Sequence, residues 1–586
     1  MLIQLTHTNS VNELPQDRIG LLEIVNGDCV IHHAVTRNAE AVVTNTPVIK
    51  RSETQCNCFT LTLPGKTPIL KLIKQAHAIN KDQGVPVTTQ TSLQGDIRDA
   101  VEQLKEEEKE LFQWTKQWYP IAVVDFLDPS RPHAMQLLGK DIVLWRDGSR
   151  QWRCFEDFCP HRLAPLSEGR VESDGTLLCA YHAWRFDSEG NCVSIPQSED
   201  KQTEAKHCSN KKSCAVAYPT QERQGLLWVW PESGQEAQVE SQLRTPRIIP
   251  ELEEDSDRVV QLFWNIRDLP YGWDFFMENV ADPAHVPVSH HGIMGSRYKD
   301  AKYYDMPRIR EMSTQGGFSF EITPVAPMLK QKVHDFQPPC HMRVVSTFED
   351  GGKLILALYA SPTRPGWCRH IGCQVLVKNE AGKQPPGVGF FALPMPIWLG
   401  HVLASLFLHQ DAVFLHYQEK TLSKRGKDRW LDAVYTPNPQ DKMVIAFRQW
   451  LEKRAGGGIP WASECNSELP SAERDKQKLF DVWATHTQHC QVCQDALKNI
   501  NRLSVLAYVA AVVCFGLGVM VDARAVAIKV AAASIEQTAT SFLTVVPPVG
   551  FWLALGSAIL FAIVGYLLKK FSRLFYVYEF EHAHND

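Results

Sequence analysis

The stretch CPHRLAPLSEGRVESDGTLLCAYH, residues 159–182, contains two Cys/His pairs. One residue separates Cys159 from His161, two separate Cys179 from His182, and seventeen lie between the pairs. Thiolates and imidazoles are both metal ligands. The repeated pairing therefore predicts that two loops bind one metal centre.

A Rieske [2Fe–2S] cluster has two cysteines on one iron and two histidines on the other. Each loop would then send its cysteine to one iron and its histidine to the second. A Cys₂His₂ zinc site is the alternative. Zinc fingers generally pair Cys with Cys and His with His, whereas these pairs are mixed. We therefore predict a Rieske cluster bound by Cys159, His161, Cys179 and His182.

The residues around these loops, 113–235, predict a compact β domain. Short apolar runs such as IAVVDFL, DIVLWRD and GLLWVWP are separated by Gly, Pro, Asp and Ser. Residues 236–258 are polar and acidic, which indicates a linker. A second domain, 259–480, mixes strand-like and helical patterns, and a helix is expected to begin at Asn438, with Pro439 at its first position.

The second domain contains MENVADPAHVPVSHH, residues 277–291. Asp282, His285 and His290 follow the spacing D-x₂-H-x₄-H. Two histidines and one carboxylate on one face of a metal leave positions open for O₂, as in non-haem Fe(II) oxygenases. The motif therefore predicts a mononuclear iron site.

Two features of this iron site stay open in the sequence. Pro287 is expected to end or kink a helix between the histidines and to let His290 turn back toward the metal; His291 is the rival ligand. Asp411 is the favoured carboxylate because it lies in a largely apolar helical stretch, where an unpaired charge is costly. Glu419 and Glu278 are the alternatives.

The bulk composition indicates an intracellular globular protein of several domains. The chain has 586 residues, 44% of them hydrophobic and 22% charged. Its net charge of −5 argues against a nucleic-acid-binding protein. Sixteen cysteines in this length do not indicate a disulfide scaffold, and their CxH, CxxH and CxxC contexts favour a reducing compartment.

The N-terminal extension, 1–112, differs from the rest of the chain. Its first residues do not form a secretory signal, whereas 29–81 has the low acid content of a transit peptide. We treat this extension as a candidate targeting region, with 1–91 irregular and a connector helix over 92–116.

Two uncharged apolar runs near the C-terminus, 503–521 and 549–568, each have the roughly 20 residues needed to cross a bilayer. A buried hairpin is the alternative. Basic residues precede the first run and follow the second, so the positive-inside rule places both chain ends and the catalytic bulk on one side. That side is cytosol or stroma.

The sequence resembles the Rieske non-haem iron oxygenases and, within them, the pheophorbide a oxygenase group. The matching segments lie within 113–586 and include WTKQWYP, CPHRLAPLSEGR, MENVADPAHVP, YTPNPQDKMVIAFRQWL and HTQHCQVC. The group also contains the translocon-associated Rieske protein, the protochlorophyllide-dependent translocon component and, more distantly, chlorophyllide a oxygenase. Ala183 departs from the group, which usually has Gly there.

This resemblance implies an α+β architecture with an N-terminal Rieske β-sandwich domain, a helix-grip-type α/β catalytic domain and two C-terminal transmembrane helices. It implies iron ligands His285, His290 and Asp411. It also implies a homotrimer in which Asp282 bridges the Rieske histidine of one subunit to the iron histidine of the next. Ferredoxin would supply the electrons.

The resemblance also concerns Cys490 and Cys493 in the segment 486–500, where the group's CxxC pair is linked to thioredoxin control. Such thiols can form a disulfide, and exposed ones exchange readily. Because the sequence offers no second CxxC for a Cys₄ zinc site, we interpret this pair as redox-active. A structural pair, or half of a metal site, is the alternative.

The implied function is oxygenation of a chlorophyll-derived tetrapyrrole, with oxidative ring opening of pheophorbide a favoured. The implied location is a chloroplast membrane, thylakoid or inner envelope, with the catalytic domain facing the stroma. The alternatives are a sibling oxygenase acting on chlorophyllide, protochlorophyllide or a phyllobilin, and a redox-sensing component of a protein-import complex.

Overall fold

The computed structural model describes residues 2–4, 18–25, 28–37, 40–44, 110–254, 257–386, 395–426, 430–536 and 546–582. The chain forms two compact units: Met1–Leu63 with Pro68–Lys109, and Pro64–Thr67 with Glu110–Asp586. The second unit contains all of the predicted metal ligands. Most of the predicted connector helix lies outside the described residues, and the described positions 110–116 are not helical.

The first unit contains a four-stranded antiparallel sheet, where the sequence analysis expected irregular structure. Its strands are β1 (Leu2–Gln4), β2 (Arg18–Val25), β3 (Asp28–Arg37) and β4 (Glu40–Thr44). Val25 pairs with Asp28, so only Asn26 and Gly27 separate β2 from β3. Asn-Gly between two strand-like runs is a strong local signal for such a hairpin.

The predicted β domain is present as three small antiparallel sheets, in the strand orders β12-β11-β10-β9, β13-β8-β7-β6 and β14-β15-β5. The strands are β5 (Tyr119–Val123), β6 (His133–Leu137), β7 (Lys140–Arg146), β8 (Trp152–Glu156), β9 (Arg170–Val171), β10 (Leu177–Leu178), β11 (Arg185–Phe186), β12 (Cys192–Ser194), β13 (Ala217–Tyr218), β14 (Thr220–Arg223) and β15 (Leu226–Val229). A short helix, α3 (Lys201–Cys208), follows β12. The three apolar runs singled out in the sequence form β5, β7 and β15.

The predicted linker is not a free connection. It contains α4 (Gln235–Leu243) and α5 (Glu251–Glu254), which the polar sequence did not suggest. The buried Trp118 indole donates hydrogen bonds to the carbonyls of Ser241 (3.1 Å) and Arg244 (2.9 Å). These contacts pack the segment onto the β domain.

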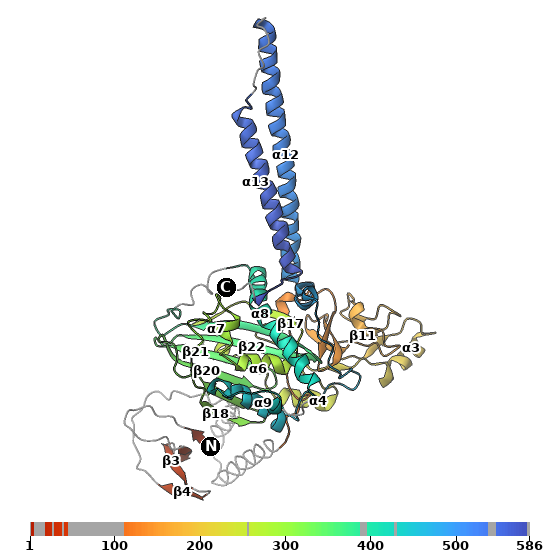
Figure 1. Ribbon diagram of the computed structural model, residues 1–586. Coiled ribbons are helices and arrows are strands. Elements are labelled where there is room, and N and C mark those ends of the chain that lie inside the picture. Colours follow the sequence, from red (N-terminus) through yellow and green to blue (C-terminus); the bar gives the residue numbers. More distant parts are fainter. Residues whose placement is uncertain are drawn as a thin grey trace. The chain divides into compact units, whose positions relative to one another are not determined.

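The catalytic region is built on an eight-stranded antiparallel sheet of order β16-β23-β22-β21-β20-β19-β18, in which β17 also pairs with β23. Its strands are β16 (Val259–Gln261), β17 (Asn265–Leu269), β18 (Arg308–Ser313), β19 (Gly317–Glu321), β20 (Leu329–Gln337), β21 (His341–Phe348), β22 (Lys353–Arg364) and β23 (Trp367–Val377). Three longer helices belong to this region: α6 (Trp273–Ala281), α8 (Ile397–Lys424) and α9 (Lys442–Arg454). Figure 1 shows α6 beside β22 and α9 beside β18.

The helix expected to begin at Asn438 is confirmed, with a short turn before it. Asn438 and Asp441 form a reciprocal capping box around a 3₁₀ turn, Pro439–Asp441, which leads into α9. Pro439 occupies a first-turn position, where its missing N–H leaves no bond unmade.

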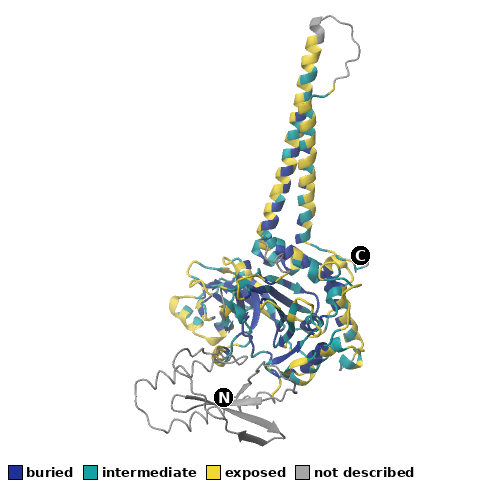
Figure 2. Cartoon of the chain, turned by 90° about the vertical axis from the view of Figure 1, so that its left-hand side faces the viewer, coloured by how far each residue is buried: buried dark blue, intermediate teal, exposed yellow. Residues whose placement is uncertain are grey.

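The C-terminal apolar runs form a helical hairpin, α12 (Gln491–Glu536) and α13 (Val549–Ser572), whose two helices run side by side (Figure 1). Most of the hairpin is exposed or half-buried (Figure 2), including large side chains such as Leu506, Val512 and Leu553. Such apolar exposure over the length of a bilayer indicates membrane spans.

Three described helices are long and apolar enough to cross a membrane, and α8 is the third. It contacts β17 and α6 and buries polar residues, among them Gln410 and Asp411, so we assign it to the catalytic region. Both ends of the hairpin adjoin that region: α12 begins beside its core, and Tyr576, after α13, accepts a hydrogen bond from the N–H of Val482 at 2.8 Å.

Candidate metal centres

The two Cys/His loops of the β domain have the same backbone geometry although their spacings differ. In each loop the residue four positions after the cysteine has a φ of +59°: Leu163 in the first loop and Ala183 in the second. The bonds that close the loops are also equivalent: Cys159 N to Ala164 O (2.8 Å), Leu163 N to Cys159 O (2.9 Å), Cys179 N to Trp184 O (2.9 Å) and Ala183 N to Cys179 O (3.0 Å). The left-handed position explains why Gly suits the site of Ala183.

The four side chains are arranged with sulfur inside and imidazole outside. Cys159 and Cys179 are each 1% exposed, whereas His161 is exposed and His182 half-buried. The two imidazole rings lie 4.5 Å apart. Burial raises the pKa of Cys159 to about 12, so a cationic centre is needed to keep a thiolate there. Two buried sulfurs and two less buried imidazoles, one of them exposed, fit a cluster that exchanges electrons through its histidine side.

The D-x₂-H-x₄-H residues surround a one-turn helix, α7 (Val286–Ser289). His285 is its N-cap and His290 its C-cap, and Pro287 lies in its first turn. The expectation that Pro287 ends or kinks a helix is therefore wrong: proline is tolerated in the first turn of a helix, and Pro287 is the second residue of α7. This single helical turn brings the His285 and His290 imidazoles close to each other.

His285, His290 and Asp411 form a cluster whose ligand atoms all lie within 4.8 Å of one another. The Asp411 Oδ2 atom is 3.1 Å from His290 Nε2 and 3.6 Å from His285 Nε2. Asp411 comes from α8, so the tertiary fold joins it to the other two. Two imidazoles and one carboxylate are the donor set of a mononuclear non-haem iron site.

Both imidazoles are oriented by their second nitrogen. His290 Nδ1 lies 2.8 Å from the Gln410 amide oxygen, and His285 Nδ1 lies 2.5 Å from the Asp282 carbonyl. Each Nδ1–H thus donates outward and leaves the Nε2 lone pair facing Asp411. Buried His290 Nε2 has no hydrogen-bond partner among the described residues, as expected for an atom that binds a metal.

The Asp411 carboxylate is held by two residues that the sequence analysis did not single out. The Ser289 hydroxyl donates to Oδ1 at 2.8 Å, and the Asn279 amide donates to Oδ2 at 3.0 Å. Burial opposes ionisation of Asp411, but the adjoining His290 and His285 side chains and the Ser289 hydroxyl outweigh it and lower its pKa. The ionised acid is the form that binds a cation.

The rival ligands point elsewhere. His291 Nδ1 accepts a hydrogen bond from the Arg297 N–H at 3.0 Å. Glu419 accepts from the Gly272 N–H at 3.0 Å and pairs with Lys420 at 2.8 Å. Glu278 is paired with Arg448. The structure thus groups His290 and Asp411, rather than these alternatives, with His285.

Asp282 has a different position from the three grouped residues. Its carbonyl orients His285, and its carboxylate Oδ2 lies 3.7 Å from His285 Nδ1. The Asp282 side chain is 29% exposed, so a group from outside the chain can reach it. In Figure 1, α7 lies over the left part of the catalytic sheet, and β11, the strand that follows the second cluster loop, lies in the β domain to the right.

Cys490 directly precedes α12 and Cys493 lies in its first turn. Both thiols are free and buried, with 0% and 1% of the residue exposed. A redox pair that exchanges readily needs exposed thiols, whereas these two sulfurs are enclosed.

Comparison with known proteins agrees with these two centres. Residues 117–208 match the Rieske [2Fe-2S] domain family, and residues 336–429 match the pheophorbide a oxygenase family. A pheophorbide a oxygenase of Oryza sativa is 34% identical over 455 residues, 74% of this chain and 82% of that protein. The chain belongs to the pheophorbide a oxygenase family.

Other members of the family carry different names. Flavonoid 8-hydroxylase 2 of Ocimum basilicum is 31% identical, covering 69% of this chain and 77% of that protein. The protochlorophyllide-dependent translocon component 52 of Arabidopsis thaliana is 29% identical, covering 70% and 78%. This pheophorbide a oxygenase family member is thus a Rieske monooxygenase with a [2Fe–2S] cluster and a mononuclear non-haem iron.

Proposed function

We propose that the chain oxygenates a chlorophyll-derived tetrapyrrole and that its preferred reaction is the oxidative opening of pheophorbide a. The convergence of His285, His290 and Asp411 in a chain with a Rieske domain carries the proposal, because a protein that only transfers electrons has no use for this second site. Relatives named for pheophorbide a and protochlorophyllide support a tetrapyrrole.

The assignment of ligands follows from the two geometries. Cys159, His161, Cys179 and His182 bind the cluster. His285, His290 and Asp411 would hold an iron, which would supply the activation of O₂. Around it, Gln410 and the Asp282 carbonyl keep the imidazole protons on the outward nitrogens, and Ser289 and Asn279 hold the carboxylate.

Asp282 is assigned to electron transfer between subunits of a homotrimer. Its carboxylate adjoins an iron histidine and is partly exposed, and the cluster histidine His161 is exposed as well. A neighbouring subunit's cluster histidine is therefore the partner that we infer for Asp282. Ferredoxin is the inferred donor.

The membrane hairpin supports an apolar, membrane-partitioning substrate. Chloroplast names among the relatives support a plastid membrane, thylakoid or inner envelope, with the catalytic region in the stroma. Return of the chain to the same region after α13 is consistent with both chain ends lying on one side.

The test supplies the detergent-solubilised full-length protein with ferredoxin, its reductase, NADPH and ¹⁸O₂, together with pheophorbide a, chlorophyllide a, protochlorophyllide or a flavone. We expect a ring-opened product containing one labelled oxygen from pheophorbide a. The His285→Ala protein should keep the electron paramagnetic resonance (EPR) signal of the reduced cluster and make no product.

Each other outcome has a defined meaning. Product only from the flavone would reject the tetrapyrrole proposal and favour hydroxylation like that named for the basil relative. An intact cluster and iron without product from any pigment would favour the redox-sensing alternative. In that case thioredoxin would be the partner to test.

A further inference from the structure

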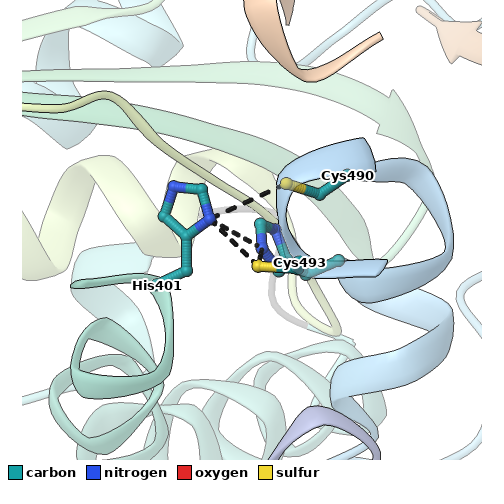
Figure 3. Close-up of side chains that lie close together, drawn as sticks. His401, Cys490 and Cys493 are labelled. Carbon is teal, nitrogen blue, oxygen red and sulfur yellow. Dashed lines mark hydrogen bonds between the residues drawn. The ribbon is translucent and has the colours of Figure 1, made fainter. Parts of the chain in front are cut away.

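A second group of metal-ligand residues lies at the base of the membrane hairpin, apart from both iron centres. His401, His486, Cys490 and Cys493 place one ligand atom each within 4.8 Å of every other. We call these four residues the anchor cluster. Figure 3 shows His401 of α8 pointing at Cys490 and Cys493, which come from the start of α12.

The distances within the anchor cluster match the edges of a tetrahedron around one ion. Zn–N bonds of about 2.0 Å and Zn–S bonds of about 2.3 Å give edges of about 3.3 Å between two nitrogens and about 3.5 Å between nitrogen and sulfur. His401 Nδ1 lies 3.2 Å from His486 Nε2, 3.2 Å from Cys493 Sγ and 3.7 Å from Cys490 Sγ. His486 Nε2 lies 3.2 Å from Cys493 Sγ.

The outward nitrogens of both imidazoles are already used. His401 Nε2 lies 2.9 Å from the Trp264 carbonyl, and His486 Nδ1 lies 2.7 Å from the Ile266 carbonyl. Because a carbonyl only accepts, each outward nitrogen carries the proton and each inward nitrogen presents a lone pair. Two lone pairs 3.2 Å apart repel each other unless a cation or a proton lies between them. Outer hydrogen bonds of this kind typically orient metal-bound histidines.

Burial favours a closed structural site over an exchanging redox pair. The four residues are between 0% and 3% exposed, and both cysteines belong to the hydrophobic core that includes Trp264. A thioredoxin active site must reach a sulfur atom in order to attack it. A divalent cation with two thiolates and two neutral imidazoles carries no net charge, so its burial costs little.

We propose that the anchor cluster binds one structural zinc ion. The ion joins the first turn of α12 to α8, the helix that also carries Asp411, and its histidines are in turn bonded to backbone carbonyls at β17. The membrane anchor is thereby fixed to the helix that completes the iron site. This inference does not depend on which substrate the enzyme oxidises.

The experiment measures metals in the detergent-solubilised full-length protein after exchange into metal-free buffer. We expect about one zinc per chain besides the three irons of the two redox centres. X-ray absorption at the zinc edge should show two sulfur and two nitrogen neighbours. Cys493→Ser with His486→Gln should lower the zinc content at least tenfold. Cys514→Ser, the matched control further along α12, should retain it.

Three results would overturn the proposal: a wild-type protein without zinc, a fourth iron at this position, or a Cys490–Cys493 disulfide found by mass spectrometry in protein alkylated before purification. Thiols that only donate hydrogen bonds to the inward nitrogens would give the first result. Because the wild-type measurements decide among these outcomes, the test holds even where a variant fails to fold. The EPR signal of the Rieske cluster, measured in parallel, reports whether each variant is folded.

Discussion

The chain contains two sets of two cysteines and two histidines, and they differ in locality and in exposure. The Rieske set lies within 24 residues of sequence, residues 159–182, on two equivalent loops, with one imidazole at the surface. The anchor cluster draws on α8, a turn and the start of α12, and all its members are buried. A centre that passes electrons needs an exposed edge, whereas a centre that joins elements needs an enclosed one. The same donor types therefore serve opposite purposes.

The largest effect that separates the two sets is expected from His182→Ala. Loss of one imidazole ligand should remove the Rieske EPR signal and lower product formation by at least about 10³-fold, because the proposed reaction receives its electrons through the cluster. The zinc content should stay at one per chain. Zinc analysis, EPR and product assays on one preparation measure all three.

If His182→Ala lost zinc as well as the cluster, the Rieske set and the anchor cluster would fold as one unit. The contrast between two independent centres would then be wrong. The Leu163→Ala protein is the matched control. It changes an exposed residue of the other loop without removing a ligand, so cluster and zinc should both remain.

The second effect concerns stability. His401→Gln should lower the free energy of unfolding by about 4 kcal/mol, as expected when a metal ligand is lost from a buried site. Urea titration followed by tryptophan fluorescence and by limited proteolysis at the base of α12 measures this change. His409→Gln, on the same helix and also buried but outside the anchor cluster, is the control for helix packing. Equal losses in both variants would contradict a special role for His401.

The third effect lies between the redox centres. Asp282→Asn keeps the backbone carbonyl that orients His285, so zinc, cluster and iron should stay in place. Because the variant removes the charge of the carboxylate that we infer links the two redox centres, oxidation of the reduced cluster should slow by about 10–100-fold. Stopped-flow absorbance of the pre-reduced protein mixed with O₂ and substrate measures the step. An unchanged rate would remove Asp282 from the electron path while leaving the ligand assignment intact.

The same difference in locality decides which site residues could be predicted from the sequence. The Rieske ligands and the D-x₂-H-x₄-H residues lie on short stretches, so their spacing alone indicates their geometry. Asp411 was identified from a charge in an apolar helix and from the resemblance, but Gln410, Ser289 and Asn279 were not, because nothing in their local sequence marks them as supports of a metal site. Whether a polar side chain faces a site is decided by tertiary packing.

The anchor cluster shows the limit most clearly. The missing second CxxC favoured a redox pair over a Cys₄ zinc site at Cys490 and Cys493 and left half of a metal site as the alternative, but the ligands that complete the anchor cluster are single histidines. His401 is 85 residues from His486, in a helix that reads as a buried apolar segment. The N-terminal sheet is a different case, because its Asn26-Gly27 signal was available locally and was overlooked.

The smallest predicted effect tests the loop geometry that distinguishes the Rieske set. Ala183 and Leu163 both have a φ of +59°, a region that costs an L-residue roughly 1 kcal/mol and glycine almost nothing. Ala183→Gly should therefore stabilise the folded domain by at most about 0.5 kcal/mol, after the greater freedom of glycine in the unfolded chain is subtracted. The measurement is the urea midpoint of cluster absorbance.

Leu163→Gly provides the internal comparison, because the residue has the same backbone conformation but a side chain that is 70% exposed and buries little. Similar gains in both variants would show that backbone strain alone is relieved and that the loops are equivalent. A lower midpoint for Ala183→Gly than for the parent would mean that the Ala183 methyl group packs usefully near the cluster. The departure from the family's usual glycine would then be a stabilising feature of this chain.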